Sequence, residues 1–194
     1  MVRAGWVLAG GASRRMGRDK ALLCWRGVPL AALAAAKVES AAGSATLIGP
    51  PERLGGLGYP VVADLYPGEG PLGGIITALH SSDARLNLVL ACDIPCVPVE
   101  FLESLLSFAE TAEAACAAAC SRPGVLEPLC AVWRRDALPV LESLFEGGVR
   151  KMSEVLSALR AARLPAAEPQ WFWNINTPEE WELHRAGELP PREK

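Results

Sequence analysis

The 194-residue chain lacks a long apolar run. Its longest stretch without a charged residue, Gly70 to Ser82, has 13 residues, whereas a transmembrane helix needs about 20 apolar ones. The N-terminus also lacks the basic segment, the sustained apolar run and the small-residue cleavage site of a secretory signal. These absences predict a cytoplasmic protein that does not act in a membrane.

An excess of charge of either sign is also missing. Nineteen Lys and Arg residues against 22 Asp and Glu residues give a net charge of −3, so no broad basic surface exists to attract nucleic acid. The six cysteines are too dilute for a disulfide scaffold and are expected to be reduced. The cysteines include two Cys-x-x-x-Cys pairs, but neither of the two histidines lies near a pair in the sequence, which disfavours a structural zinc site. Cys116 and Cys120 are instead expected to pack in a buried strand.

Hydrophobic residues make up 51% of the chain and charged residues 21%, which is ample material for a core. Short apolar runs alternate with longer helical patterns, and this alternation predicts an α/β fold with a mostly parallel central sheet. A single domain over residues 1–188 and a frayed tail over 189–194 are expected. Strands are predicted at 5–9, 45–48, 61–63, 86–91, 114–120, 129–133 and 171–175, and helices at 29–42, 73–82, 99–110, 136–145, 151–159 and from 178.

The segment Leu8–Lys20 reads LAGGASRRMGRDK and directly follows the first predicted strand. Adjacent glycines let the main chain approach an anion closely, and Arg15 and Lys20 add positive charge, so the segment suits a triphosphate. Its spacing is neither that of a P-loop nor that of a dinucleotide-binding fingerprint. The alternative is an ordinary glycine turn with a solvated basic face.

Asp93 follows the most apolar predicted strand, Leu86–Ala91. Open α/β sheets bind their ligands beyond the carboxyl ends of such strands. A carboxylate in this position can hold Mg²⁺ against phosphate oxygens, because this ion prefers oxygen ligands. The alternative is an N-cap of the helix that follows, from which Pro95 and Pro98 separate it.

Segment Leu8–Lys20 resembles the Leu-Ala-Gly-Gly-x-Ser-x-Arg-Met-Gly-x-Asp-Lys signature of the molybdenum cofactor guanylyltransferases. Three later segments resemble other motifs of this family in the same order: Gly70–Ile75 (GPLGGI), Cys92–Pro95 (CDIP) and Asn174–Glu180 (NINTPEE). The resemblance spans positions 8 to 180. It implies a three-layer, Rossmann-like nucleotide-diphospho-sugar transferase fold.

The same resemblance implies the roles of individual residues. It makes Arg15, Lys20 and Asp93 the catalytic residues, with Asp93 as the ligand of a Mg²⁺ cofactor. The residues expected to bind the nucleotide are Leu8, Ala9, Gly10, Gly11, Lys20, Asp64 and Asp93. From the sequence pattern alone, Asp64 would be a loop residue.

The implied reaction transfers GMP from GTP to molybdenum-bearing molybdopterin, forms molybdopterin guanine dinucleotide and releases pyrophosphate. Transient contact with molybdoenzyme maturation proteins is expected as well. The alternatives are a related nucleotidylyltransferase that uses CTP or a sugar-phosphate acceptor, and a non-catalytic cofactor-binding homologue. The Gly10-Gly11 pair favours the guanylyltransferases, because related cytidylyltransferases more often open with Ala-Ala-Gly.

One position departs from the family pattern, since Gly49 stands where an asparagine that contacts the nucleotide commonly follows the second strand. Base specificity is therefore less well defined. Trp171–Trp173 is interpreted as sheet and core, with Asn174 and Asn176 as candidates to reach the pterin. The Arg150-Lys151 pair is either a contact for the pterin phosphate or a solvated pair. No role is assigned to either histidine, His80 or His184.

Overall fold

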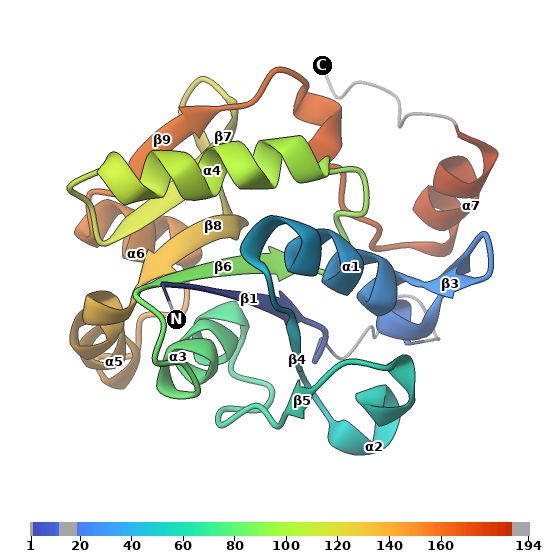
Figure 1. The fold of residues 1–194 in the computed structure, drawn as a ribbon, viewed down its shortest axis with the longest axis horizontal. Helices are drawn as coiled ribbons and strands as arrows, with labels where there is room; N and C mark the ends of the chain where they lie inside the picture. The colour runs from blue at the N-terminus through green and yellow to red at the C-terminus, as the bar shows by residue number, and fades with distance from the viewer. Residues whose placement is uncertain (1, 12–18, 188–194) are drawn as a thin grey trace.

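A computed structural model describes residues 2–11 and 19–187, and within them one seven-stranded sheet lies between two layers of helices (Figure 1). All neighbouring strands are parallel except β8, which is antiparallel to both of its neighbours. The predicted mostly parallel sheet is thus confirmed. In sheet order the strands are β5 (Val61–Val62), β4 (Thr46–Ile48), β1 (Arg3–Leu8), β6 (Leu86–Ala91), β8 (Val125–Arg134), β7 (Cys116–Arg122) and β9 (Ala162–Pro165).

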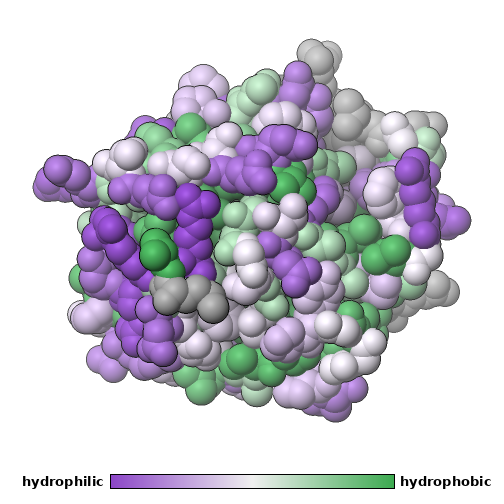
Figure 2. Space-filling view, in the orientation of Figure 1, coloured by the Kyte–Doolittle hydropathy of each residue, from purple (hydrophilic) through white to green (hydrophobic). Residues whose placement is uncertain are grey.

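The helices form the two outer layers. Helices α1 (Leu30–Ala42) and α4 (Val99–Thr111) cover one face of the sheet, and α3 (Pro71–His80), α5 (Leu138–Glu146) and α6 (Met152–Ala158) cover the other. The surface over α1 and α4 is mixed in hydropathy, with only small separate green areas (Figure 2), because their apolar faces are turned to the sheet. None of the helices in the described ranges is long and apolar enough to cross a membrane.

Shorter elements lie around the ends of the strands. A hairpin of β2 (Cys24–Trp25) and β3 (Val28–Pro29) follows the glycine-rich segment, and α7 (Pro178–Ala186) packs near the start of α1 through Trp181 and Leu30. The other short elements are α2 (Pro51–Leu54) and the 3-10 helices η1 (Lys20–Leu22), η2 (Gly55–Leu57), η3 (Arg135–Ala137) and η4 (Pro169–Phe172).

Strand β6 is the centre of the core, as its apolar sequence predicts. All six of its residues are buried, and its side chains alternate between the two helical layers: Leu88 and Leu90 pack with α1 and α4, whereas Val89 packs with α3. Its one polar residue, Asn87, accepts a hydrogen bond from Nε1 of Trp6 (3.0 Å). The central strand therefore contributes apolar contacts to both faces of the sheet.

The sequence-based expectations about the fold are wrong or incomplete at three places. The predicted strand at 171–175 is instead the end of η4 followed by irregular backbone, although Phe172 is buried as expected. The last strand of the sheet is β9, a half-exposed edge strand with too few apolar residues to be recognised. The β2–β3 hairpin was not predicted either; its turn places Arg26 and Gly27 at φ of 50° and 82°.

Candidate active site

The carboxyl ends of the neighbouring parallel strands β1, β4 and β6 meet at one edge of the sheet. The N–H of Ala9 donates to the carbonyl oxygen of Ile48 at the end of β4 (2.9 Å), and the N–H of Cys92 donates to that of Leu8 at the end of β1 (3.2 Å). Ligands of open α/β sheets bind beyond this edge. The glycine-rich segment after β1 and the Cys92-Asp93 pair after β6 therefore begin at the same place.

Two glycines touch where β1 and β4 end. A Cβ atom on Gly49 would lie 3.1 Å from both Cα and N of Gly10 and 2.8 Å from Cδ1 of Leu54. Contacts this short force the neighbouring backbone to move. In this chain a side chain at position 49 would therefore require Gly10 and Leu54 to shift.

The residues that end β1 can offer a ligand little beyond their backbone. The side chain of Leu8 packs on α3, where a Cβ atom on Gly74 would lie 3.0 Å from its Cδ2. Ala9 is 2% exposed, whereas Gly10 and Gly11 are exposed. Among the described residues that follow β1, these two glycines present main chain to solvent. Arg15 lies outside the described residues, and its catalytic role stays a prediction.

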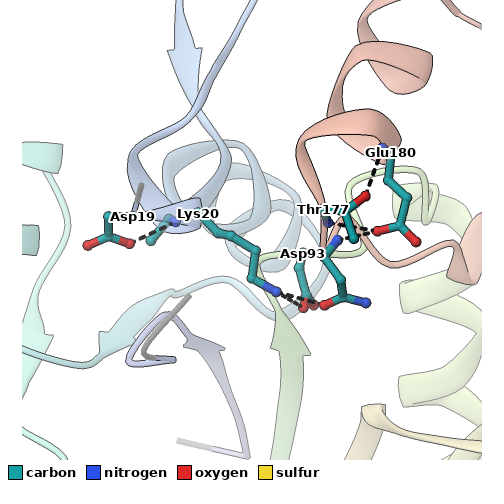
Figure 3. A network of polar contacts seen from close by, with 7 residues as sticks. Asp19, Lys20, Asp93, Thr177 and Glu180 are labelled. Carbon is teal, nitrogen blue, oxygen red and sulfur yellow. Dashed lines mark hydrogen bonds and ion pairs between the residues drawn. The ribbon is translucent and has the colours of Figure 1, made fainter. Parts of the chain in front are cut away.

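The ammonium group of Lys20 joins two side chains from distant parts of the chain (Figure 3). It donates to Oδ2 of Asp93 and to Oδ1 of Asn176, in each case at 2.9 Å. The side chains of Lys20 and Asp93 are only 16% and 19% exposed, so their ion pair is largely shielded from water. The structure thus brings together two of the predicted catalytic residues and adds Asn176, which the sequence indicated only for the pterin.

Asp19 holds the start of η1 in place. Its Oδ1 accepts a hydrogen bond from the N–H of Ala21 (3.1 Å), which caps this short helix, and its Oδ2 accepts one from the guanidinium of Arg53 in α2 (2.6 Å). The backbone of Lys20 is therefore fixed beside the end of β4. The Asp19–Arg53 ion pair joins two segments that are far apart in the sequence, and it was not predicted.

The start of α7 fixes Asn176. Thr177 and Glu180 form a capping box, in which the side chain of each residue bonds to the backbone N–H of the other (Figure 3). Oε2 of Glu180 also accepts from the N–H of Asn176 (2.6 Å), and the N–H of Ile175 donates to the carbonyl oxygen of Asp93 (2.9 Å). The Thr-x-x-Glu spacing is a sequence signal that could have identified this anchored turn.

Asp93 retains one carboxylate oxygen without a partner. Its Oδ1 is buried and accepts no hydrogen bond within the described residues. Helix α4 begins at Val99 with Pro98 at its N-cap, so the interpretation of Asp93 as a helix cap is wrong. A buried carboxylate oxygen without a donor is unfavourable, and a bound cation would satisfy it.

The donor set around Asp93 fits magnesium better than a metal held entirely by protein. The described residues contain no group of three or more His, Cys, Asp and Glu side chains able to hold a metal ion. Magnesium commonly binds through one or two carboxylates together with the phosphate oxygens of a substrate. Asp93 is the carboxylate that would hold it here.

Asp64 anchors the loop between β5 and α3. Its Oδ1 accepts hydrogen bonds from the N–H of Tyr66 and from the hydroxyl of Thr77, both at 3.0 Å. Thr77 is fully buried in α3, so the loop is attached to a rigid part of the fold. The structure agrees with a loop role for Asp64, and its contact with a nucleotide stays a prediction.

Lys37 of α1 holds the loop that follows Asp93. Its ammonium donates to the carbonyl oxygens of Pro95 (2.5 Å) and Val97 (2.8 Å). Burial lowers the pKa of Lys37, while the neighbouring Cys96 and Glu100 oppose that change. This residue was missed because a lysine in an alanine-rich helix gives no sign of what it will contact.

Arg150 connects two loops rather than standing free in solvent. Its guanidinium pairs with Glu69 before α3 (2.9 Å), donates to the carbonyl oxygens of Phe145 and Val149, and lies 3.8 Å above the Phe145 ring. Arg150 is exposed, as the interpretation as a solvated charge expects, and these contacts also hold it against Glu69 and Phe145. Its suggested contact with a pterin phosphate stays a prediction.

Comparison with known proteins relates this geometry to one family. The model of the MobA-like NTP transferase domain matches residues 5–164. A probable molybdenum cofactor guanylyltransferase of Flavobacterium johnsoniae is 32% identical over 177 residues, which cover 90% of this chain and 92% of the relative. A protein of the same name from a Nostoc species is 35% identical over 178 residues, with 90% and 86% covered.

Solved structures give the same result for the fold. Molybdopterin-guanine dinucleotide biosynthesis protein A of Archaeoglobus fulgidus superposes with a TM-score of 0.80 at 26% identity, over 94% of this chain and 97% of that one. The CTP complex of CMP:2-keto-3-deoxy-manno-octonic acid synthetase superposes at 0.72 with 15% identity, covering 95% and 97%, a likeness of fold alone. The predicted Rossmann-like nucleotide-transferase fold is confirmed.

Proposed function

Because the chain belongs to the family of MobA-like NTP transferase domains, we propose that it transfers GMP from GTP to the phosphate of molybdenum-bearing molybdopterin and releases pyrophosphate. The observation that carries this proposal is the contact of Lys20 with Asp93 and Asn176 beside the exposed Gly10-Gly11 backbone. A cation, a carboxylate and an exposed glycine backbone at one sheet edge suit a nucleoside triphosphate. We further propose that the reaction takes place in the cytoplasm and that the protein contacts molybdoenzyme maturation proteins transiently.

In the proposed reaction the protein mainly positions the reactants and stabilises charge. The Gly10-Gly11 backbone approaches the phosphates, and Lys20, already oriented by Asp93 and Asn176, stabilises negative charge that grows on the leaving pyrophosphate. Asp93 would hold magnesium through its unpaired Oδ1, and the bound ion would neutralise phosphate charge. The acceptor phosphate then attacks the α-phosphorus in line.

The proposed transfer uses no covalent protein intermediate. The thiol nearest to Asp93 in sequence is Cys92, which is buried. Burial and the adjacent Asp93 raise the pKa of Cys92 to about 12, so this thiol stays neutral at physiological pH and is a poor nucleophile. Direct attack by the acceptor phosphate is consistent with this chemistry.

Pyrophosphate release tests the proposal. Purified protein is incubated with magnesium, molybdenum-bearing molybdopterin and, in separate reactions, GTP, CTP, UTP or ATP. GTP is expected to give the fastest release. A parallel set of reactions contains a sugar phosphate in place of molybdopterin. Faster release with CTP, turnover only with the sugar phosphate, or GTP binding without any pyrophosphate would each overturn the proposal.

A further inference from the structure

The imidazole of His184 in α7 is buried among three tryptophan rings. It is 8% exposed, and its ring centroid lies 5.2 Å from that of Trp25, 6.0 Å from that of Trp181 and 6.2 Å from that of Trp173. Its Nδ1 lies 3.9 Å from Sγ of Cys96, a hydrogen-bonding distance for sulfur. These five residues are called the His184 cluster.

The His184 cluster joins the three segments that carry Lys20, Asp93 and Asn176. Its tryptophan in β2 belongs to the hairpin that follows Lys20, and its cysteine belongs to the loop that follows Asp93. Its tryptophan at the end of η4 lies on the segment that leads to Asn176. A single ring in α7 therefore contacts residues on all three of these segments.

A purely structural role does not explain a histidine here. Its Nε2 is buried and has no hydrogen-bond partner within the described residues. Such an orphaned nitrogen is unfavourable, and phenylalanine would fill an aromatic cage without that cost. The feature that phenylalanine could not reproduce is the contact between Nδ1 and the Cys96 thiol.

We propose that His184 is a positioning residue for the transfer reaction. Its Nδ1 contact with Cys96 holds the loop after Asp93 against α7, so that Asp93 and Asn176 stay within reach of the same Lys20 ammonium. Lys37 holds the carbonyl oxygens on either side of Cys96, which leaves the thiol facing the imidazole as the adjustable contact. The link to catalysis rests on the proposed function, whereas the ordering of the loop can be measured without turnover.

Hydrogen exchange of residues 92–97 tests the ordering of the loop. His184→Phe keeps an aromatic ring in the cage, Cys96→Ala removes the thiol from the other side, and His80→Phe serves as a matched control because His80 pairs with Glu142 on α5. Both cluster variants should exchange about tenfold faster than the wild type in this loop, and the control should not. Unchanged exchange in both cluster variants overturns the proposal.

Kinetics then separate positioning from general stability. Each cluster variant should lose about tenfold in kcat with little change in KM for GTP, since misplacement of reacting groups lowers rate more than binding. The double variant should lose no more than either single one, because both remove the same contact. The proposal is overturned if the kcat loss of the double variant equals the product of the two single losses, or if kcat is unchanged in the single variants. A wild type without turnover counts against the proposed function alone, and the exchange result still decides the role of His184.

Discussion

A single ammonium group connects the residues at the carboxyl edge of the sheet. Lys20 neutralises Asp93 and orients the amide of Asn176, and the partial burial of the pair strengthens both contacts. Because Oδ1 of Asp93 has no hydrogen-bond partner within the described residues, a second cation bound there would not have to displace Lys20. In the proposed reaction, the side chain that orders these ground-state contacts would also stabilise the transition state.

Replacing Lys20 by methionine should remove this stabilisation while keeping the length of the side chain. We expect kcat for pyrophosphate release to fall about 10²–10³-fold, the usual effect of losing one group that stabilises transition-state charge. Arg3→Met is the control. Arg3 lies at the start of β1, at the opposite end of this strand from the site, and pairs with Glu110 of α4. A folded Lys20→Met protein with nearly normal kcat would contradict the catalytic role of Lys20.

The contact between Gly10 and Gly49 leads to a prediction about stability. Gly49→Ala places a Cβ atom 2.8 Å from Leu54 and 3.1 Å from Gly10, so we expect the free energy of unfolding to fall by about 1–3 kcal/mol. Gly56→Ala is the control, since its Cβ would meet no atom within 4 Å. Urea unfolding of both variants measures the difference, and equal stabilities would show that the strand ends can separate freely.

Among the larger elements, α7 and the loop after β6 are coupled. Helix α7 is fixed by its capping box at one end and by the His184 cluster along its length, while the loop is held from α1 by Lys37. The loop between β6 and α4 and the turn before α7 lie outside regular secondary structure. Side-chain contacts, together with the hydrogen bond from the N–H of Ile175 to the carbonyl oxygen of Asp93, hold Asp93 and Asn176 in place.

Burial lowers the pKa of His184, and the positive charge of Lys37 lowers it further. The unfolded chain takes up this proton near pH 6.5, and the folded protein only at lower pH. The unfolded state therefore binds more protons over that interval, and the free energy of unfolding should fall as pH drops below about 6.5.

Urea midpoints between pH 7.5 and 5 measure this loss, and His184→Phe should lack the His184 part of it. Other ionisable groups of the described residues near the cluster are Lys37, Cys96 and Arg26, which lies over the ring of Trp25. Arg185 and Glu182 lie on α7 itself. They are present in both proteins, so the difference between the two curves reports His184. Parallel curves over the whole range would show that His184 is not kept neutral by the fold.

At the scale of the whole molecule, short apolar runs were enough to predict the central strands. β6 was recognisable because both of its faces are buried, and Asp93 followed from its position at the end of that strand. Strand β9 could not be recognised from the sequence, because an edge strand in which every second residue is exposed resembles a loop. The 171–175 segment has strand-like composition, yet Phe172 packs against Phe101 of α4 instead of joining the sheet.

The candidate site was predictable only in part. Lys20 and Asp93 could be named from the sequence, whereas their contact with Asn176 joins positions at opposite ends of the chain. The contacts of Lys37 and those within the His184 cluster also join distant positions, and no local sequence pattern marks these residues. Long-range side-chain contacts depend on how layers pack, and a linear pattern of residues does not encode them locally. The roles of Arg15 and Asp64 toward the nucleotide stay predictions.

Transfer of the labelled α-phosphate tests the proposed reaction most directly. GTP labelled at its α-phosphate is incubated with the protein, magnesium and molybdenum-bearing molybdopterin, and the products are separated. The proposed function predicts that the label moves into molybdopterin guanine dinucleotide, with one pyrophosphate released for each dinucleotide formed, and that Asp93→Asn abolishes both together. Label that stays in GTP, or that appears in free GMP without any dinucleotide, would contradict it.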